Sequence, residues 1–317
     1  MYKLIRFYNQ NRKKILITIL IIVFILGIIQ LLNYFVKVNK EEKINPDNVI
    51  IKNNTNSQGV ISDKSAVSGE NVSSTKLKKD TDVINEFINY CNEGNIDSAY
   101  NLLTEECKEE MFTTVEDFNN IYYSKLFDSN KTHTIENWIG NTYKVNFTGD
   151  ILTTGDVNEQ QTKRDYITVV KEDGESKLNI NNFIRREKID KQVENNKIEI
   201  KVEKADIYMD SITYTVYIKN NSYRTIMMDP LTNVDTMYIE DSNGVQYSAY
   251  THEIAKENLN LGVSQAKKVD IKYYSKYSST KDITKMVFSN VISDFERYDS
   301  LRDKSKYGNY LGIEIKI

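Results

Sequence analysis

The chain has 317 residues, with 42 lysines and arginines against 45 aspartates and glutamates and a formal net charge of −3. This balance excludes the strongly basic surface that general nucleic-acid binding requires. Because the chain has only 2 prolines and 12 glycines but 22 tyrosines and 11 phenylalanines, most of it is expected to fold.

The first predicted element is an uncharged apolar stretch over residues 15–36. About 20 apolar residues suffice to cross a bilayer as a helix, so this stretch predicts a single transmembrane helix in contact with the lipid bilayer. Residues 1–14 contain five basic residues and no acid, which predicts a cytoplasmic tail and an extracytoplasmic remainder. A cleaved signal peptide is the alternative, but bulky residues follow the stretch where small ones are expected. The predicted location is therefore the cell membrane, with a single pass.

Residues 37–79 are dominated by asparagine, serine, lysine and glutamate and show no hydrophobic period. Such a segment cannot bury enough apolar surface to offset the entropy of ordering, so it is expected to be a flexible linker.

Residues 80–190 are expected to form an α+β domain. Apolar spacing over residues 83–91 predicts a first helix that Asp80 or Thr81 caps and Gly94 ends. Candidate caps for three further short helices follow in the order Asn95, Thr104 and Thr114.

Beyond these helices the hydrophobic period changes to two, which predicts strands at residues 143–147, 166–170 and 178–180. Asp173 and Gly174 give the signal of a hairpin turn between the last two. Helices followed by an antiparallel sheet are typical of an α+β domain.

The order of these elements, with the piece INYCNEGNIDSAYNLLTEECKEEMF, resembles the opening of the NTF2-like fold, in which helices pack into a curved sheet to form a cone. Some members of that superfamily are enzymes that use carboxylates or tyrosines inside the cone. The resemblance makes Asp150, Asp165 and Tyr166 candidate cavity residues. The alternative is that they are ordinary strand residues.

The two cysteines, Cys91 and Cys107, both fall in the predicted helices of this domain. Outside the cytoplasm such a pair is free to oxidise, and closing this loop stabilises a fold by roughly 3 kcal/mol in the chain-entropy model. A Cys91–Cys107 disulfide is predicted, with two buried free thiols as the alternative. Neither has a second ligand nearby in sequence, so no metal or other cofactor is expected.

Residues 195–317 show period-two patterning throughout, and Asn243-Gly244 gives a further hairpin signal. Several short strands separated by turns predict an antiparallel β-sandwich. The stretches DSNGVQY, NLGVSQAKKVDIKYY and ITKMVFSNVI resemble immunoglobulin-like accessory domains of Gram-positive proteins. The whole arrangement resembles a clostridial-type family of membrane-anchored proteins of unknown function.

One strip of this second domain interleaves basic and aromatic residues as nucleic-acid or glycan surfaces do. It comprises Lys267, Lys268, Lys272, Tyr273 and Tyr274; a solvated strand edge is the alternative. Trp138, the only tryptophan, is either a core residue or a second candidate for a binding surface.

No catalytic motif withstands inspection, so the sequence favours a non-enzymatic, membrane-tethered binding or scaffold module of the cell envelope. Its expected partner is another envelope protein or a cell-wall component rather than nucleic acid. A transfer-channel scaffold of the conjugation type is a special case of this hypothesis. The alternative is an anchored small-ligand receptor or enzyme that uses the cone cavity.

Overall fold

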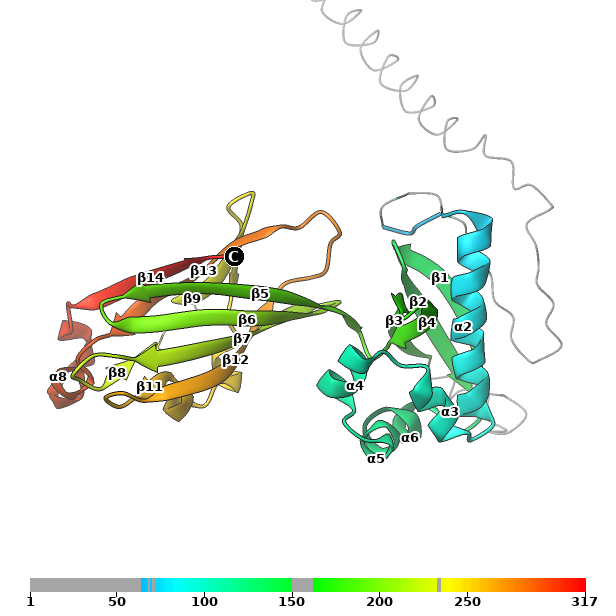
Figure 1. Ribbon diagram of the computed structural model, residues 1–317, viewed down its shortest axis with the longest axis horizontal. Helices are drawn as coiled ribbons and strands as arrows, with labels where there is room; N and C mark the ends of the chain where they lie inside the picture. The colour runs from blue at the N-terminus through cyan, green and yellow to red at the C-terminus, as the bar shows by residue number, and fades with distance from the viewer. Residues whose placement is uncertain (1–63, 68, 70–71, 150–161, 233–234) are drawn as a thin grey trace, which may run out of the picture. The chain divides into compact units, whose positions relative to one another are not determined.

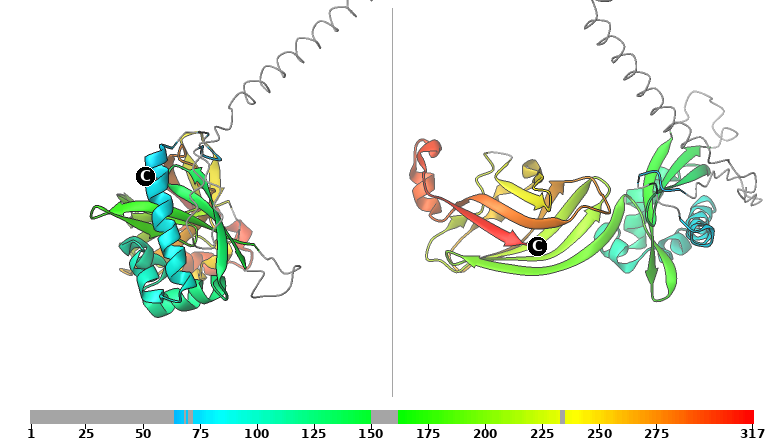
Figure 2. Two further views of the ribbon diagram at one scale, coloured as in Figure 1. Left: turned by 90° about the vertical axis from the view of Figure 1, so that its right-hand side faces the viewer. Right: turned by 90° about the horizontal axis from the view of Figure 1, so that it is seen from above.

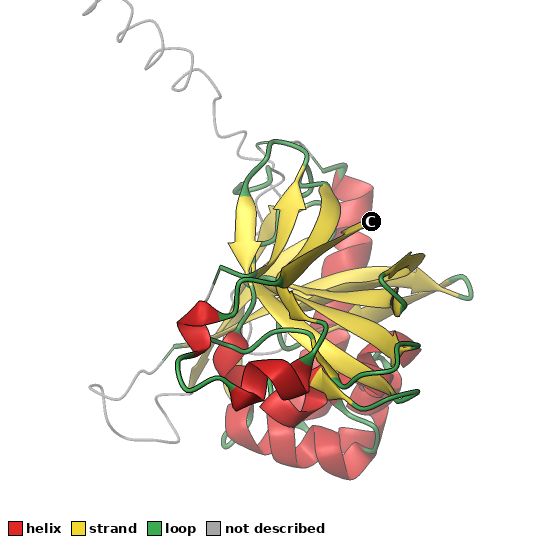
Figure 3. Ribbon diagram, turned by 90° about the vertical axis from the view of Figure 1, so that its left-hand side faces the viewer, coloured by secondary structure: helices red, strands yellow, loops and turns green. Residues whose placement is uncertain are grey.

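The computed structural model describes residues 64–317, except residues 68, 70–71, 150–161 and 233–234. About 45% of the described residues lie in strands and 25% in helices. Figure 3, coloured by secondary structure, shows this predominance of strand.

The structure overturns the expectation of a single transmembrane helix. No helix within the described ranges is long and apolar enough to cross a bilayer. The 19-residue helix α2 (Ser74–Asn92) carries lysines and acids along its exposed side, and the predicted residues 15–36 lie outside the described residues. The structure therefore does not support the single-pass fold class, the membrane location or the cytoplasmic and extracytoplasmic assignments.

The first part of the described chain is a series of mostly short helices. They are α2, α3 (Ile96–Asn101), α4 (Glu105–Met111), α5 (Val115–Phe118), the π-helix η1 (Asn119–Tyr123) and α6 (Ser124–Leu126). The predicted caps are confirmed, because Asn95, Thr104 and Thr114 each accept a backbone hydrogen bond at the start of α3, α4 and α5.

Helix α2 begins earlier than the predicted start near residue 80. The side chain of Ser73 accepts a backbone hydrogen bond from the first turn at 3.3 Å. Leu77 is buried about two turns before Ile84, so the apolar face extends toward the N-terminus. Gly94 ends the helix as predicted, with a φ of +71° that glycine adopts without strain.

The end of the predicted linker 37–79 is ordered rather than flexible. Residues 74–79 are part of α2. The backbone N–H groups of Ala66 and Val67 donate to the carbonyls of Asn137 and Trp138 at 3.0 and 3.2 Å. Residues 37–63 lie outside the described residues.

A four-stranded antiparallel sheet in the order β1-β2-β3-β4 follows the helices. Its strands are β1 (Lys131–Ile139), β2 (Thr142–Gly149), β3 (Lys163–Glu172) and β4 (Glu175–Asn179). Asp173 and Gly174 form the predicted hairpin turn, both with positive φ. Helix α2 lies along one face of this sheet (Figures 1 and 2).

The buried residues from Leu77 to Phe183 form what we call the first cluster, between these helices and this sheet. Aromatic rings fill its centre. Phe118 lies 5.5 to 6.3 Å, between ring centroids, from Phe87, Tyr100, Phe112 and Tyr122. Offset and edge-on pairs at these distances are favourable beyond the area that they bury.

Two further sheets make up the rest of the described chain. One has the order β12-β7-β6-β5, and the other has the order β10-β9-β13-β8-β11 with β14 paired to β13. The strands are β5 (Phe183–Asn195), β6 (Ile198–Tyr208), β7 (Ser211–Asn220), β8 (Ile226–Met227), β9 (Met237–Asp241), β10 (Gln246–Ser248), β11 (Asn260–Leu261), β12 (Ala266–Tyr274), β13 (Ile283–Ile292) and β14 (Tyr310–Lys316).

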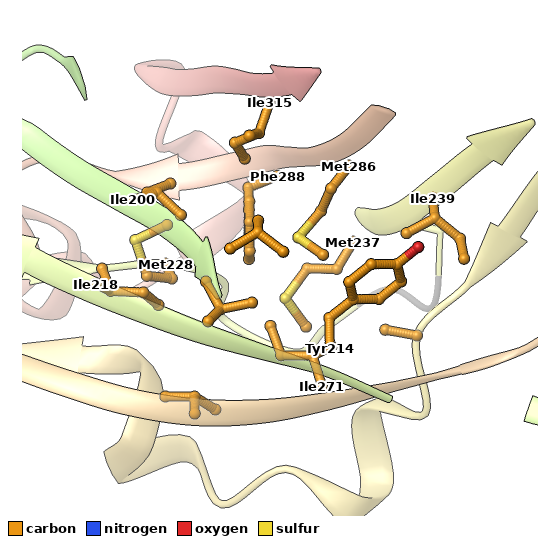
Figure 4. Close-up of a cluster of buried hydrophobic side chains, with 14 of the residues drawn as sticks. Ile200, Tyr214, Ile218, Met228, Met237, Ile239, Ile271, Met286, Phe288 and Ile315 are labelled. Atoms are coloured by element: carbon orange, nitrogen blue, oxygen red, sulfur yellow. The ribbon is translucent and has the colours of Figure 1, made fainter. Parts of the chain in front are cut away.

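The buried residues from Ile184 to Ile315 form the second cluster, to which both of these sheets contribute. Figure 4 shows how Met228, Met237, Met286 and Phe288 meet Ile200, Ile218 and Tyr214. Methionine side chains fill irregular gaps of this kind because they are unbranched and flexible.

The expectation of a purely β second part is wrong in detail. A helix, α8 (Phe295–Ser300), and three 3₁₀ turns, η2 (Thr251–Glu253), η3 (Lys256–Leu259) and η4 (Lys304–Lys306), lie between its strands. Tyr298 of α8 packs with Met227, Ile292 and Tyr307 in a small third cluster.

Residues 185–194, where the two expected domains 80–190 and 195–317 should meet, are part of strand β5. This strand pairs with β6 from Phe183 to Asn195. Phe183 belongs to the first cluster and Ile184 to the second, so one continuous strand serves both.

The ring-filled centre of the first cluster generates a stability prediction. Phe118→Ala removes a fully buried ring and is expected to lower the free energy of unfolding by roughly 3–5 kcal/mol. Ile121→Ala, in the following π-helix, is the matched control because Ile121 is 43% exposed; its expected cost is under about 1 kcal/mol. Denaturant unfolding of both variants measures the difference, and equal losses would contradict the assignment of Phe118 to the core.

His133 generates a prediction about pH. It is buried on β1, its Nε2 lies 2.7 Å from Asn85 Oδ1 of α2, and Nδ1 has no partner. Burial lowers the pKa of His133 to about 4. The unfolded chain therefore takes up a proton near pH 6.5 and the folded chain only near pH 4, so stability is lost as pH falls through this range, by about 3 kcal/mol at most.

The measurement is the free energy of unfolding between pH 7 and pH 4, compared with His133→Gln. The variant has no titrating ring at this position, so its curve should fall less steeply over the same range. Parallel curves for the two proteins would refute a neutral, buried His133.

Candidate binding surface

The candidate cavity residues of the first part do not line an open cone. Asp165 is buried on β3, where its carboxylate accepts the Tyr122 hydroxyl at 2.8 Å and the backbone N–H groups of Tyr166, Asn181 and Asn182 at 2.7–2.9 Å. Burial raises the pKa of Asp165, and these hydrogen bonds oppose the rise. A carboxylate with four donors holds the turn before β5 in place and has no free lone pair directed at a ligand.

The other two candidates of this set lie elsewhere. Tyr166 is half-buried on the opposite side of β3, with its ring 5.4 Å from that of Trp138. Asp150 lies outside the described residues. The structure therefore does not bring this trio together.

Trp138 is half-buried rather than part of the core. Its ring contacts Tyr166 on one side, and the ammonium of Lys144 lies 5.2 Å from its centroid. Lys144 in turn forms an ion pair with Glu136 at 2.7 Å. Trp138 is thus covered by its own neighbours on the sheet.

A hollow of about 750 Å³ lies beside the first turn of α2 and is lined in part by Lys76, Lys79, Asp80, Asn141 and Lys171. At its wall Asp80 is already engaged, because it accepts the Tyr143 hydroxyl at 2.8 Å and pairs with Lys76 at 3.0 Å. This hollow is the described space in the first part that suits the small-ligand alternative.

Both cysteines are free and buried in the structure, so the predicted Cys91–Cys107 disulfide is not formed in it. Cys91 lies on α2 and Cys107 on α4, and both belong to the first cluster. Burial raises the pKa of both thiols, that of Cys107 to about 12. They serve as small apolar residues of the core.

The predicted basic and aromatic strip lies on β12, but the strand divides it between two faces. Tyr273 is fully buried in the second cluster, whereas Lys268, Lys272 and Tyr274 point outward. Lys267 donates to the carbonyls of Glu257 and Asn260 at the strand's start. Alternation along a strand puts neighbours on opposite faces, so the five candidates cannot form one surface.

The outward residues join a cluster of rings, which we call the ring cluster: Tyr250, His252 and Tyr274. The ring centroids of Tyr250 and Tyr274 are 5.7 Å apart, and those of Tyr250 and His252 are 5.5 Å apart. The ammonium of Lys272 lies 5.1 Å from the Tyr250 centroid. Tyr274 is 54% exposed, so the cluster presents an aromatic surface to its surroundings.

The backbone brings this cluster together. Tyr250 N–H donates to the carbonyl of Lys272 at 2.8 Å, next to a β-bridge between Ala249 and Tyr273. The 3₁₀ turn η2 then places His252 beside Tyr250. Tyr250 and His252 were missed by the sequence analysis, because nothing local in the sequence links them to β12.

The lysines around the ring cluster are already paired with acids. Lys268 lies 2.6 Å from Glu203, and Lys272 lies 3.8 Å from Glu253. Asp270, between them on the outer face, accepts the Thr215 hydroxyl at 2.6 Å. Little unpaired positive charge remains to attract phosphate, so this surface is suited to a partner of low net charge.

The described residues contain no group of three histidine, cysteine, aspartate or glutamate side chains that is placed to hold a metal ion. The two histidines lie in different parts of the structure: His133 on β1 beside Asn85, and His252 in the ring cluster.

Comparisons with known proteins add little. No known family profile matches the chain, and no curated protein matches it. A solved structure described as a conserved hypothetical protein from Bacillus anthracis aligns with 37% of this chain and 85% of its own, at 13% identity and a TM-score of 0.22. A likeness at that score supports no argument, so neither the NTF2-like nor the immunoglobulin-like resemblance is confirmed.

The buried thiols generate a prediction. Native protein treated with iodoacetamide at pH 8 should remain unmodified, because both thiols are shielded and their pKa values lie well above that pH. After unfolding without reductant, both cysteines should be alkylated at the rate of exposed thiols. Mass spectrometry reads both results, and a peptide pair joined through Cys91 and Cys107 in the unreduced protein would contradict them.

Proposed function

We propose that this protein is a non-enzymatic binding or scaffold module that contacts a partner protein through the ring cluster. The observation that supports this most directly is the exposed contact of Tyr250, His252 and Tyr274 beside Lys272. Three side chains from two separate segments converge there and remain accessible.

Tyrosine is enriched at protein interfaces because it offers a large, rigid contact area at a small cost in side-chain entropy. Its hydroxyl provides a hydrogen bond at the rim of that contact. Partial burial raises the pKa of Tyr250, with Tyr274, Asp210 and Glu253 adding to the effect, so the hydroxyl stays neutral under physiological conditions. A neutral aromatic surface flanked by paired charges suits a protein surface better than a polyanion.

The alternative, a small-ligand receptor or enzyme that uses the first part of the fold, is favoured by one observation: the hollow beside α2. Against it stand the aromatic filling of the first cluster and the engaged carboxylates Asp80 and Asp165. A scaffold role in a conjugation-type assembly stays a prediction from resemblance.

The test uses the full-length chain with the photo-cross-linking residue benzoylphenylalanine at position 274, expressed in the cells that make the protein. Irradiation should give a discrete protein adduct, and Tyr250→Ala in the same chain should reduce its yield about tenfold, as loss of an interface tyrosine does. Adduct masses are read by immunoblot and mass spectrometry.

The matched control places the same residue at Tyr223, an isolated tyrosine that is 84% exposed with the ammonium of Lys197 4.4 Å from its centroid. It shares exposure and a lysine neighbour with Tyr274 but belongs to no ring cluster. Equal adducts at the two positions, or none at 274, would overturn the proposal. An adduct at 274 that glycan hydrolases remove would show a polysaccharide partner and reject the protein one.

A further inference from the structure

A cavity of about 460 Å³ opens into the second cluster, away from the ring cluster. Its floor is apolar and comes from β6, β7 and the neighbouring strands. The residues of this floor are Ile189, Ile207, Ile212, Tyr214, Ile283 and Ile317. This volume lies within the range of roughly 300–1,000 Å³ that is usual for small-molecule sites.

The cavity arises because β5 carries charged residues on its inward face. Arg185 and Glu187 are in register with Ile207 and Ala205, whose side chains belong to the second cluster. Directly opposite residues share a face of the sheet, so both charged side chains point toward the cluster. They pair with each other at 2.6 Å and form one wall of the cavity.

A loop over residues 276–282 forms the opposite rim. It is held at both ends, because Tyr277 N–H donates to Met209 O at 2.9 Å and Asp282 O accepts from Ser242 N–H at 2.8 Å. Arg185 also donates to the Tyr277 hydroxyl at 3.0 Å. The rim is therefore a fixed polar boundary around an apolar chamber.

Two lysines of this rim, Lys276 and Lys281, form no ion pair with any carboxylate of the described chain. Lys281 is half-buried and donates to Ser275 Oγ at 2.7 Å and to the carbonyl of Lys276 at 2.6 Å. Burial lowers the pKa of Lys281, with Asp241 opposing the shift. Among the lining residues, Arg185 is paired with Glu187, so Lys276 and Lys281 are the two cations of the lining that have no carboxylate partner in the described chain.

We propose that this cavity binds a small amphipathic carboxylate, such as a fatty acid, with its chain on the isoleucine floor and its head group at Lys276 and Lys281. Burial of each methylene group contributes about 0.8 kcal/mol, so the apolar floor provides most of the affinity. The two lysines at the rim favour an anionic head group over a cationic one. The phenol of Tyr214, which also lines the cavity, adds a polar group at the floor.

The test uses the full-length chain and a decanoic acid that carries a diazirine at the end of its tail. After irradiation, peptide mapping should place the label on segments 185–189, 207–214 or 276–283. Decanoate should displace it at a concentration about tenfold lower than decylamine, which has the same tail and the opposite charge, because one charge-assisted contact accounts for about this factor.

Two sets of variants separate the tail site from the head site. Ile189→Trp fills the cavity and should abolish labelling, whereas Val193→Trp, on the same face of β5 but outside the lining, should leave it unchanged. In the double variant Lys276→Met/Lys281→Met, about tenfold more decanoate should be needed to displace the label. Displacement of the label by decanol, which has no charge, should be unaltered. Lys268→Met, on the outer face, is the control variant.

Label on other segments, labelling that survives Ile189→Trp, or equal displacement by decanoate and decylamine would overturn the inference. Thermal unfolding of each variant confirms that it folds. The outcome is independent of the ring cluster, because the cavity shares no residue with it.

Discussion

At the start of β5 one strand joins the two halves of the described chain, and its pairing with β6 is interrupted there by a bulge between Phe183 and Arg185. Phe183 packs into the first cluster and Ile184, the next residue, into the second. Arg186 then donates to Asp206 of β6 at 2.6 Å and to Glu109 and Glu110 of α4 at 2.9 and 2.8 Å. One guanidinium with five donors in a fixed fork can satisfy three carboxylates from two elements at once.

The energetics of this ion network follow from its burial. Burial alone would raise the pKa of Asp206, but hydrogen bonds from Arg186 and Lys204 more than offset it and hold the pKa below its ordinary value. Burial likewise raises the pKa of Glu110, only partly opposed by the Tyr208 hydroxyl at 2.7 Å. A buried or half-buried carboxylate such as Asp206 or Glu110 destabilises the fold unless the paired cations Arg186 and Lys204 are present. The network therefore makes α4 and the β5–β6 pair depend on each other. The two clusters are therefore less independent than a polar connection would make them.

Much of the secondary structure could be predicted, because local patterns decide it: the apolar face of α2, the caps of α3 to α5 and the turn at Gly174 all depend on neighbours in sequence. Two strands were missed for one shared reason. On β1 the inward positions include the buried polar residues His133 and Asn137, and on β5 they include Arg185 and Glu187, so neither segment shows the apolar alternation that identifies a strand. For residues 15–36 apolar length alone predicted a membrane-spanning helix; these residues lie outside the described ones, and no described helix is long and apolar enough to cross a bilayer.

The ring cluster and the cavity could not be predicted for a reason that lies in sheet topology. In the order β12-β7-β6-β5, the ring cluster lies on one edge strand and the charged wall of the cavity on the other. Central strands are fixed by partners on both sides, whereas an edge strand has one free side on which separate segments can settle. Tyr250 contacts β12 beside the Ala249–Tyr273 bridge, where its N–H donates to Lys272 O. The 276–282 loop borders the cavity opposite β5. Which strands become edges depends on long-range pairing, and that information is not carried by any local pattern of residues.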